Sequence, residues 1–233
     1  MKKFLIIFLM IPLFSIGQNR SQAGQNRAMG PGSNMFMNNL EDFALQKIDK
    51  VFTSEYSNNV SGKMYLFDEW QNCVVRTNLK EEGLNFTVPC NYNLYTDKFE
   101  MKIDGEKYFL KKEAVVEIIK GNRIFVPIDD EIKGEARNYM EILGTGEKYD
   151  LVNVYELKIK DVQSKRSLGL YEKKISTTDK MFFLDQKNQA LIEVPRRKKK
   201  IYKLLDLSAQ EKEEIDGNIK RTKNLIKAVE LAG

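Results

Sequence analysis

A run of basic residues is the densest cluster of chemically active side chains in this 233-residue sequence. The basic run consists of Arg196, Arg197, Lys198, Lys199 and Lys200. Such a run can bind phosphates, lipopolysaccharide or acidic partners through Coulomb attraction. Its flanks, residues 190–194 and 200–205, are predicted to be strands, so a solvated hairpin tip is the simpler interpretation. An anionic contact is the functional alternative.

The only two cysteines, Cys73 and Cys90, lie in segments predicted to form a β-hairpin. The connecting residues 80–83 end in glycine, which suits a four-residue loop built on a type I turn and would place Leu79 opposite Leu84. Counting back from that turn puts the two cysteines directly opposite each other on one face. In an oxidising compartment, the sequence therefore predicts a cross-strand disulfide. The alternative is two buried thiols that pack as small apolar groups.

Several kinds of catalysis are excluded by composition. Histidine is absent, which removes the commonest general base near neutral pH and the commonest zinc ligand. Neither Gly-x-Ser-x-Gly nor Ser-x-x-Lys occurs, so the usual serine nucleophiles cannot be assembled. The carboxylates of residues 68–69 and 129–131 lack the spacing that wraps a calcium ion. We therefore expect no catalytic residue, cofactor or metal, although paired carboxylates in a cleft stay open because their separation is invisible in a sequence.

Four aromatic residues form the other candidate group: Tyr65, Trp70, Tyr92 and Tyr95. They could stack on a sugar or line an apolar pocket. Single aromatics on alternating strands are more often core residues, and we favour that interpretation.

The N-terminus is typical of a signal peptide. Residues 1–17 combine Met-Lys-Lys with an apolar stretch at 4–13 and end in small residues, Ser15 and Gly17. That stretch is too short to span a bilayer, and we expect no transmembrane segment after cleavage. Without Lys2 and Lys3 the chain carries 36 Lys and Arg against 33 Asp and Glu. This bias is too weak to indicate a nucleic-acid partner.

The elements that would position these residues are mostly strands. Residues 18–39, rich in Gln, Asn, Gly and Ser, are predicted to form a flexible tail. Residues 40–233 are predicted to form a single β-rich domain, in which 40–52 is a short helix or strand. The expected fold class is mainly β: an antiparallel meander closed as a barrel or sandwich, with a C-terminal amphipathic helix at 208–231. That helix would begin with a capping box at Ser208 and Glu211.

Turn residues predict further hairpins. Asp104-Gly105 would set Met101 opposite Tyr108. Gly121-Asn122 would fold residues 115–119 onto 124–128. The remaining strands are expected at 139–143, 151–162, 171–176, 181–184, 190–194 and 200–205.

Three stretches resemble a group of small exported β-rich envelope proteins of Bacteroidota, whose function is unknown. They are residues 64–70 (Met-Tyr-Leu-Phe-Asp-Glu-Trp), 88–100 (Val-Pro-Cys-Asn-Tyr-Asn-Leu-Tyr-Thr-Asp-Lys-Phe-Glu) and 199–205 (Lys-Lys-Ile-Tyr-Lys-Leu-Leu). In that group, a strand that ends in a Tyr-Asn step precedes an acidic turn and another strand. The resemblance implies an envelope protein, either periplasmic or peripherally associated with the outer membrane. It assigns no catalytic residue.

The sequence thus favours a non-enzymatic exported protein that acts as a binding or accessory subunit of an envelope assembly, with another envelope protein as partner. The alternative is a lipocalin-like carrier of a small apolar ligand. A large apolar cavity would favour the carrier. A filled core with an exposed apolar patch would favour the subunit.

Overall fold

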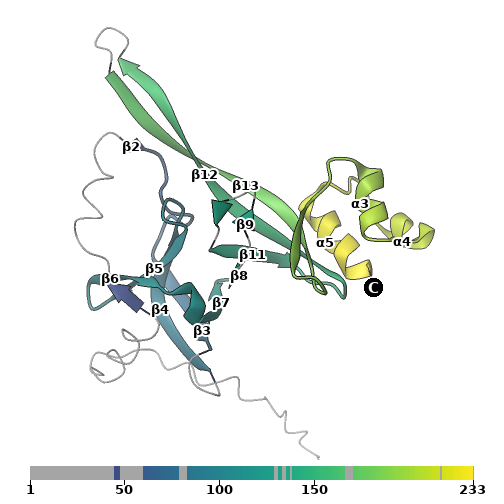
Figure 1. Ribbon diagram of the computed structural model, residues 1–233, viewed down its shortest axis with the longest axis horizontal. Coiled ribbons are helices and arrows are strands. Elements are labelled where there is room, and N and C mark those ends of the chain that lie inside the picture. Colours follow the sequence, from purple (N-terminus) through teal and green to yellow (C-terminus); the bar gives the residue numbers. More distant parts are fainter. Residues whose placement is uncertain are drawn as a thin grey trace, which may run out of the picture.

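The computed structural model describes residues 45–47, 60–78, 83–128, 131–132, 135–136, 138–165, 170–215 and 217–232. The expected signal peptide (1–17) and tail (18–39) lie outside the described residues. The described chain forms a strand-rich body, a long two-stranded ribbon and a group of helices at the C-terminal end of the chain (Figure 1).

The strands and helices have the following bounds. The strands are β1 (Leu45–Lys47), β2 (Val60–Ser61), β3 (Gln71–Thr77), β4 (Leu84–Asn93), β5 (Lys98–Ile103), β6 (Glu106–Leu110), β7 (Val115–Lys120), β8 (Arg123–Pro127), β9 (Glu131–Ile132), β10 (Glu135–Ala136), β11 (Tyr139–Gly144), β12 (Tyr149–Lys165), β13 (Leu170–Asp185) and β14 (Ala190–Glu193). The helices are the 3-10 turn η1 (Lys112–Ala114) and the α-helices α3 (Lys198–Leu204), α4 (Ala209–Glu214) and α5 (Thr222–Leu231).

Twelve strands form one sheet in the order β1-β6-β5-β4-β3-β7-β8-β11-β12-β13-β14, with β2 paired to β13. Neighbours along this path are antiparallel, whereas β2 runs parallel to β13. The chain leaves β6, passes through η1 and joins the sheet again as β7 on the far side of β3. The mainly β, antiparallel fold is therefore confirmed. The sheet is not closed as a barrel, because the path ends at β1 and β14, so the expected closure is not confirmed.

The β3–β4 hairpin forms in a register two residues away from the predicted one. Leu84 pairs with Thr77, and Leu79, its expected partner, lies outside the described residues. The strand ends early because Asn78 donates its backbone N–H to the carbonyl oxygen of Ala114 (3.2 Å), which directs the chain toward β7. A shift of two residues leaves every side chain on its original face.

The shorter hairpins have the predicted registers. Met101 pairs with Tyr108 across the β5–β6 turn, where Asp104 and Gly105 have φ of 49° and 83°. Positive φ at both central residues is the geometry that a two-residue hairpin turn requires. Ile119 pairs with Ile124 across the β7–β8 turn.

The long ribbon is formed by β12 and β13, which stay paired from Tyr149 and Asp185 to Lys165 and Leu170. The two strands predicted at 171–176 and 181–184 are thus one strand. At its base the ribbon has a core on each face. Leu151 and Phe183 face the helices, whereas Val152 and Phe182 belong to a separate cluster on the opposite face. A third and larger core fills the curved part of the sheet formed by β3–β8.

The C-terminal region corrects two predictions. Residues 200–205 were expected to be a strand, but 200–204 belong to α3 and Leu205 is its C-cap. Ile201 and Leu205 are one helical turn apart, and both are buried against the base of the ribbon. The single helix expected at 208–231 is two helices. Ser208 and Glu211 do form the predicted capping box, but the chain leaves helical geometry at Ile215, and Gly217 has a φ of 80°. We call residues 196–232 the helical unit.

None of the helices in the described part of the chain is long and apolar enough to cross a membrane.

Candidate functional site

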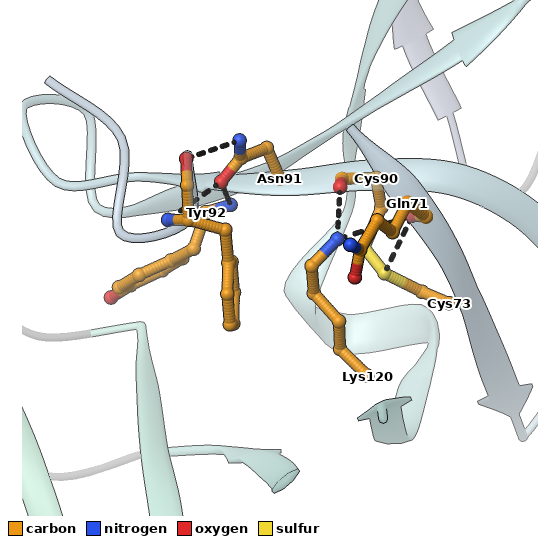
Figure 2. Close-up of a disulfide and its surroundings, with 7 residues drawn as sticks. Gln71, Cys73, Cys90, Asn91, Tyr92 and Lys120 are labelled. Atoms are coloured by element: carbon orange, nitrogen blue, oxygen red, sulfur yellow. Dashed lines mark hydrogen bonds between the residues drawn. A yellow bond between two sulfur atoms is a disulfide. The ribbon is translucent and has the colours of Figure 1, made fainter. Parts of the chain in front are cut away.

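Cys73 and Cys90 form the predicted disulfide between β3 and β4 (Figure 2). Their Cα atoms are 5.8 Å apart, and both residues are fully buried. They do not face each other directly, because Cys73 pairs with Val88 and Cys90 pairs with Gln71. The bond joins diagonal neighbours on one face of the sheet. The choice of partners is therefore confirmed, whereas the direct opposition was wrong.

Lys120, which the sequence analysis did not single out, lies buried beside the disulfide (Figure 2). Its Nζ donates to the carbonyl oxygens of Gln71 (3.1 Å) and Cys90 (2.9 Å) and lies 4.7 Å from the ring centroid of Phe67. Burial lowers the pKa of Lys120. Lysines with a lowered pKa can act as nucleophiles, but this side chain is only 3% exposed and its donors are engaged by the backbone. We therefore assign it a structural role, joining β3, β4 and β7.

The position of Lys120 had a detectable signal in the sequence. In β7, Ile118 and Lys120 alternate onto the same buried face. A lysine at a core-facing position of a strand needs a specific set of acceptors, because burial of an unpaired ammonium group is costly. The strand pattern could therefore have identified Lys120, whereas its acceptors could not be found without the fold.

A second polar cluster joins β8, β11 and β12. Arg123 donates to both carboxylate oxygens of Glu141, from Nε at 2.6 Å and Nη2 at 2.8 Å, and the Tyr155 hydroxyl donates to Glu141 at 2.6 Å. The guanidinium carbon lies 4.8 Å from the ring centroid of Phe67 and 5.1 Å from that of Phe125. Burial and the Glu141 carboxylate both raise the pKa of Tyr155. The three polar groups satisfy one another, so the cluster has the chemistry of a structural clamp.

Two of the predicted aromatics lie on the outer face of β5 and β6. Tyr65 donates to Glu100 at 2.9 Å and accepts a hydrogen bond from Lys107 at 3.1 Å. The Lys102 ammonium lies 4.4 Å from the centroid of Trp70, so a cation already covers one face of the ring.

The other two aromatics are separate from this cluster. Tyr92 is 1% exposed and packs in the core against Phe99 and Phe125. Tyr95 is partly exposed. The structure thus does not bring the four aromatics together, and it places Tyr92 in the core as favoured.

The basic run lies immediately before α3 and in its first turn, not at the tip of a hairpin. All five side chains are exposed. Within the described part of the chain, none of them forms an ion pair. Lys198 instead places its ammonium 5.1 Å from the ring centroid of Tyr202, which the Lys212 ammonium approaches to 5.7 Å from α4.

An open hollow of about 500 Å³ lies where two loops meet at the base of the ribbon. Its lining consists of Glu147, Lys148, Tyr149, Asp185, Gln186, Lys187 and Asn188. Buried Asp150 lies next to it, accepts from the side-chain amide of Gln186, and has a pKa raised by burial. Asp185 accepts from the backbone N–H groups of Lys187 (2.9 Å) and Asn188 (3.0 Å), which closes the turn. The polar groups of Asp150 and Asp185 thus hold the two loops.

Of the two carboxylate clusters, only residues 68–69 lie wholly within the described residues. Asp68 is exposed and pairs with Lys63 at 2.5 Å. The other cluster, 129–131, contributes nothing testable because residues 129–130 lie outside the described residues. In the described ranges, no three His, Cys, Asp or Glu side chains are grouped so that they could hold a metal ion.

The fold and these clusters define an open antiparallel sheet with a projecting ribbon and a basic helical unit. No family model, curated protein or solved structure matches the chain. The function proposed below is therefore argued from the sequence and structure of this chain.

Proposed function

We propose that the protein is an exported, non-enzymatic binding or accessory subunit of an assembly in the periplasm or at the outer membrane. The observation that carries the proposal is the distal part of the β12–β13 ribbon, which we call the arm (residues 158–165 and 170–176). It projects from the body of the protein (Figure 1). Within the described part of the chain, none of the arm residues belongs to the three hydrophobic clusters.

The arm has strand edges that can accept a partner. Along β12, pairing with β11 ends at Asn153, and along β13, pairing with β14 ends at Phe182. Beyond these points the described residues add only β2, at Lys173 and Lys174. Exposed strand edges present unpaired N–H and C=O groups, and an isolated two-stranded hairpin is marginally stable in water. A partner strand would stabilise the arm by pairing along its edge.

The surface of the arm supports the same conclusion. Ile159 is 47% exposed, and neighbouring Lys158 and Lys160 are exposed as well. Successive strand side chains point to opposite faces, so Ile159 is an apolar group on one face of the arm that a partner would cover, and the two lysines lie on the other face.

The filled interior of the sheet favours a subunit over a lipocalin-like carrier of a small apolar ligand. The space that a carrier would reserve for its ligand contains packed aromatic rings. The ring centroids of Tyr92, Phe99, Phe125 and Tyr139 lie 4.9 to 6.2 Å apart. A cavity in this core would require these rings to separate.

Export is supported by the disulfide, since such bonds persist mainly in oxidising compartments. The resemblance to exported β-rich proteins of Bacteroidota supports the envelope as the destination. Fractionation of cells after osmotic shock tests the compartment, and recovery of the protein with cytoplasmic markers would contradict it.

Site-specific photo-crosslinking in cells tests the subunit proposal. A photoreactive residue at Ile159 should yield a discrete crosslinked product with an envelope protein. Val116, 51% exposed on β7, provides the matched control site. Replacement of the arm by a two-residue Asn-Gly turn should abolish the association while the disulfide still forms. Equal crosslinking from both sites, or an association that survives removal of the arm, would refute the proposal.

A further inference from the structure

The excess of positive over negative charge is concentrated in the helical unit. The helical unit contains 11 Lys and Arg against 6 Asp and Glu, a net charge of +5. The rest of the chain contains 27 of each, so its net charge is zero. The whole formal charge of +5 is therefore carried by the helical unit, and the basic run supplies five of its cations.

The fold presents the basic run instead of neutralising it. Ile201 and Leu205 are 0% and 1% exposed and anchor α3 to the base of the ribbon, which leaves the preceding cations in water. The first turn of α3 contains no acidic residue, and the N-cap residue Arg197 does not cap the helix with its side chain. Nothing within α3 offsets the repulsion among five adjacent like charges, which is unfavourable for the isolated protein.

The arrangement suits a surface better than a single ligand. Consecutive helical residues are about 100° apart around the axis, so Lys198, Lys199 and Lys200 point in different directions instead of converging on one point. Three of the five are lysines, which act as mobile point charges rather than as planar forks.

We propose that the basic run binds an anionic membrane surface through the phosphate groups of its lipid headgroups. This proposal deepens the proposed function and rests on it, because it states where the subunit is held. The helical unit and the arm lie at opposite ends of the ribbon (Figure 1). The 17 residues of β12 span about 55 Å at ~3.3 Å per residue. Docking at the helical unit therefore leaves the arm free to reach its partner.

Vesicle flotation with the mature chain, residues 18–233, tests this proposal, because the apolar leader would itself enter membranes. The protein should float with phosphatidylglycerol-containing vesicles at low salt and remain unbound with phosphatidylcholine vesicles. High salt should release it, since the attraction is screened. Replacing Arg196, Arg197 and Lys198 by serine should lower partitioning by about fivefold per cation, or roughly 100-fold. Thermal unfolding of this variant should match the parent, because the replaced side chains are exposed.

The matched control replaces three exposed arm lysines, Lys158, Lys160 and Lys173, by serine. It removes the same net charge and should bind vesicles like the parent. Equal losses in both variants would show that net charge alone matters and would overturn the proposal, as would the absence of any vesicle binding. Competition by inorganic phosphate should not exceed that of chloride at equal ionic strength. Stronger competition would assign a free-phosphate site and overturn the membrane assignment.

The two proposals fail separately. If the parent protein does not bind vesicles but still crosslinks from Ile159, the membrane proposal is refuted and the accessory-subunit proposal stands. If the parent protein binds vesicles but shows no association that depends on the arm, the accessory-subunit proposal is refuted, whereas membrane binding by the basic run stands.

Discussion

Replacing Glu141 by glutamine should destabilise the protein strongly, although the two side chains have nearly the same shape. Glu141 is 6% exposed and accepts three hydrogen bonds, two from Arg123 and one from Tyr155. An amide at this position removes the negative charge and directs an NH2 group at one of these donors. The Arg123 guanidinium then lies among aromatic rings without a counter-ion.

The expected magnitude follows from the burial of this pair. Removing one partner of a buried ion pair costs about 3–5 kcal/mol, because the remaining charge stays desolvated. The Arg123 side chain is 28% exposed, so water screens part of its charge. We therefore expect the free energy of unfolding to fall by about 2–4 kcal/mol. Replacing the whole cluster by apolar groups (Arg123→Met, Glu141→Leu, Tyr155→Phe) should cost less than Glu141→Gln alone, since no buried polar group is left unpaired.

Urea unfolding measures these differences, with Trp70, the single tryptophan, as the fluorescent probe. The control is Asp68→Asn, which removes an ion pair with Lys63 whose side chains are 77% and 71% exposed. It should change the stability by no more than about 0.5 kcal/mol. A loss below about 1 kcal/mol for Glu141→Gln, or a triple variant that is less stable than the single one, would refute the structural role assigned to this cluster.

Three further predictions concern other parts of the fold. Reducing the Cys73–Cys90 disulfide, which closes a loop with a sequence separation of 17, should lower the free energy of unfolding by at most about 3 kcal/mol, and an unchanged urea midpoint under reducing conditions would contradict this. Burial lowers the pKa of folded Lys120 below its ordinary value of 10.5. Between the folded and unfolded pKa values of Lys120, the unfolded chain binds more protons than the folded one, so the free energy of unfolding should rise with pH across that window. Lys120→Met should remove this rise. An identical pH profile of stability in the variant would contradict the assignment to Lys120. Gly146→Ala should destabilise by about 1–3 kcal/mol and speed proteolysis of the helical unit, because the new Cβ would collide with the carbonyl oxygen of Val229 in α5.

Features encoded by neighbouring residues could be predicted from the sequence. The β5–β6 and β7–β8 registers follow from Asp104-Gly105 and Gly121-Asn122, since a two-residue turn sets which residues face each other. The disulfide was predictable for a related reason. Side chains alternate between the two faces of a sheet, so a register shift of two residues leaves Cys73 and Cys90 on the same face. The pairing of the two cysteines was therefore predicted correctly although the register was not. The capping box at Ser208 is equally local.

Contacts between distant segments determined the rest. Whether residues 200–205 form a strand or a helix depends on what buries Ile201 and Leu205, and that surface is the base of the ribbon. The early end of β3 depends on Ala114, which is 36 residues away from Asn78. The acceptors of Lys120 likewise come from two other strands. Turns and alternation follow from steric rules within a few residues, whereas burial and the pairing of polar groups depend on which segments meet, and that is settled only when the sheet assembles.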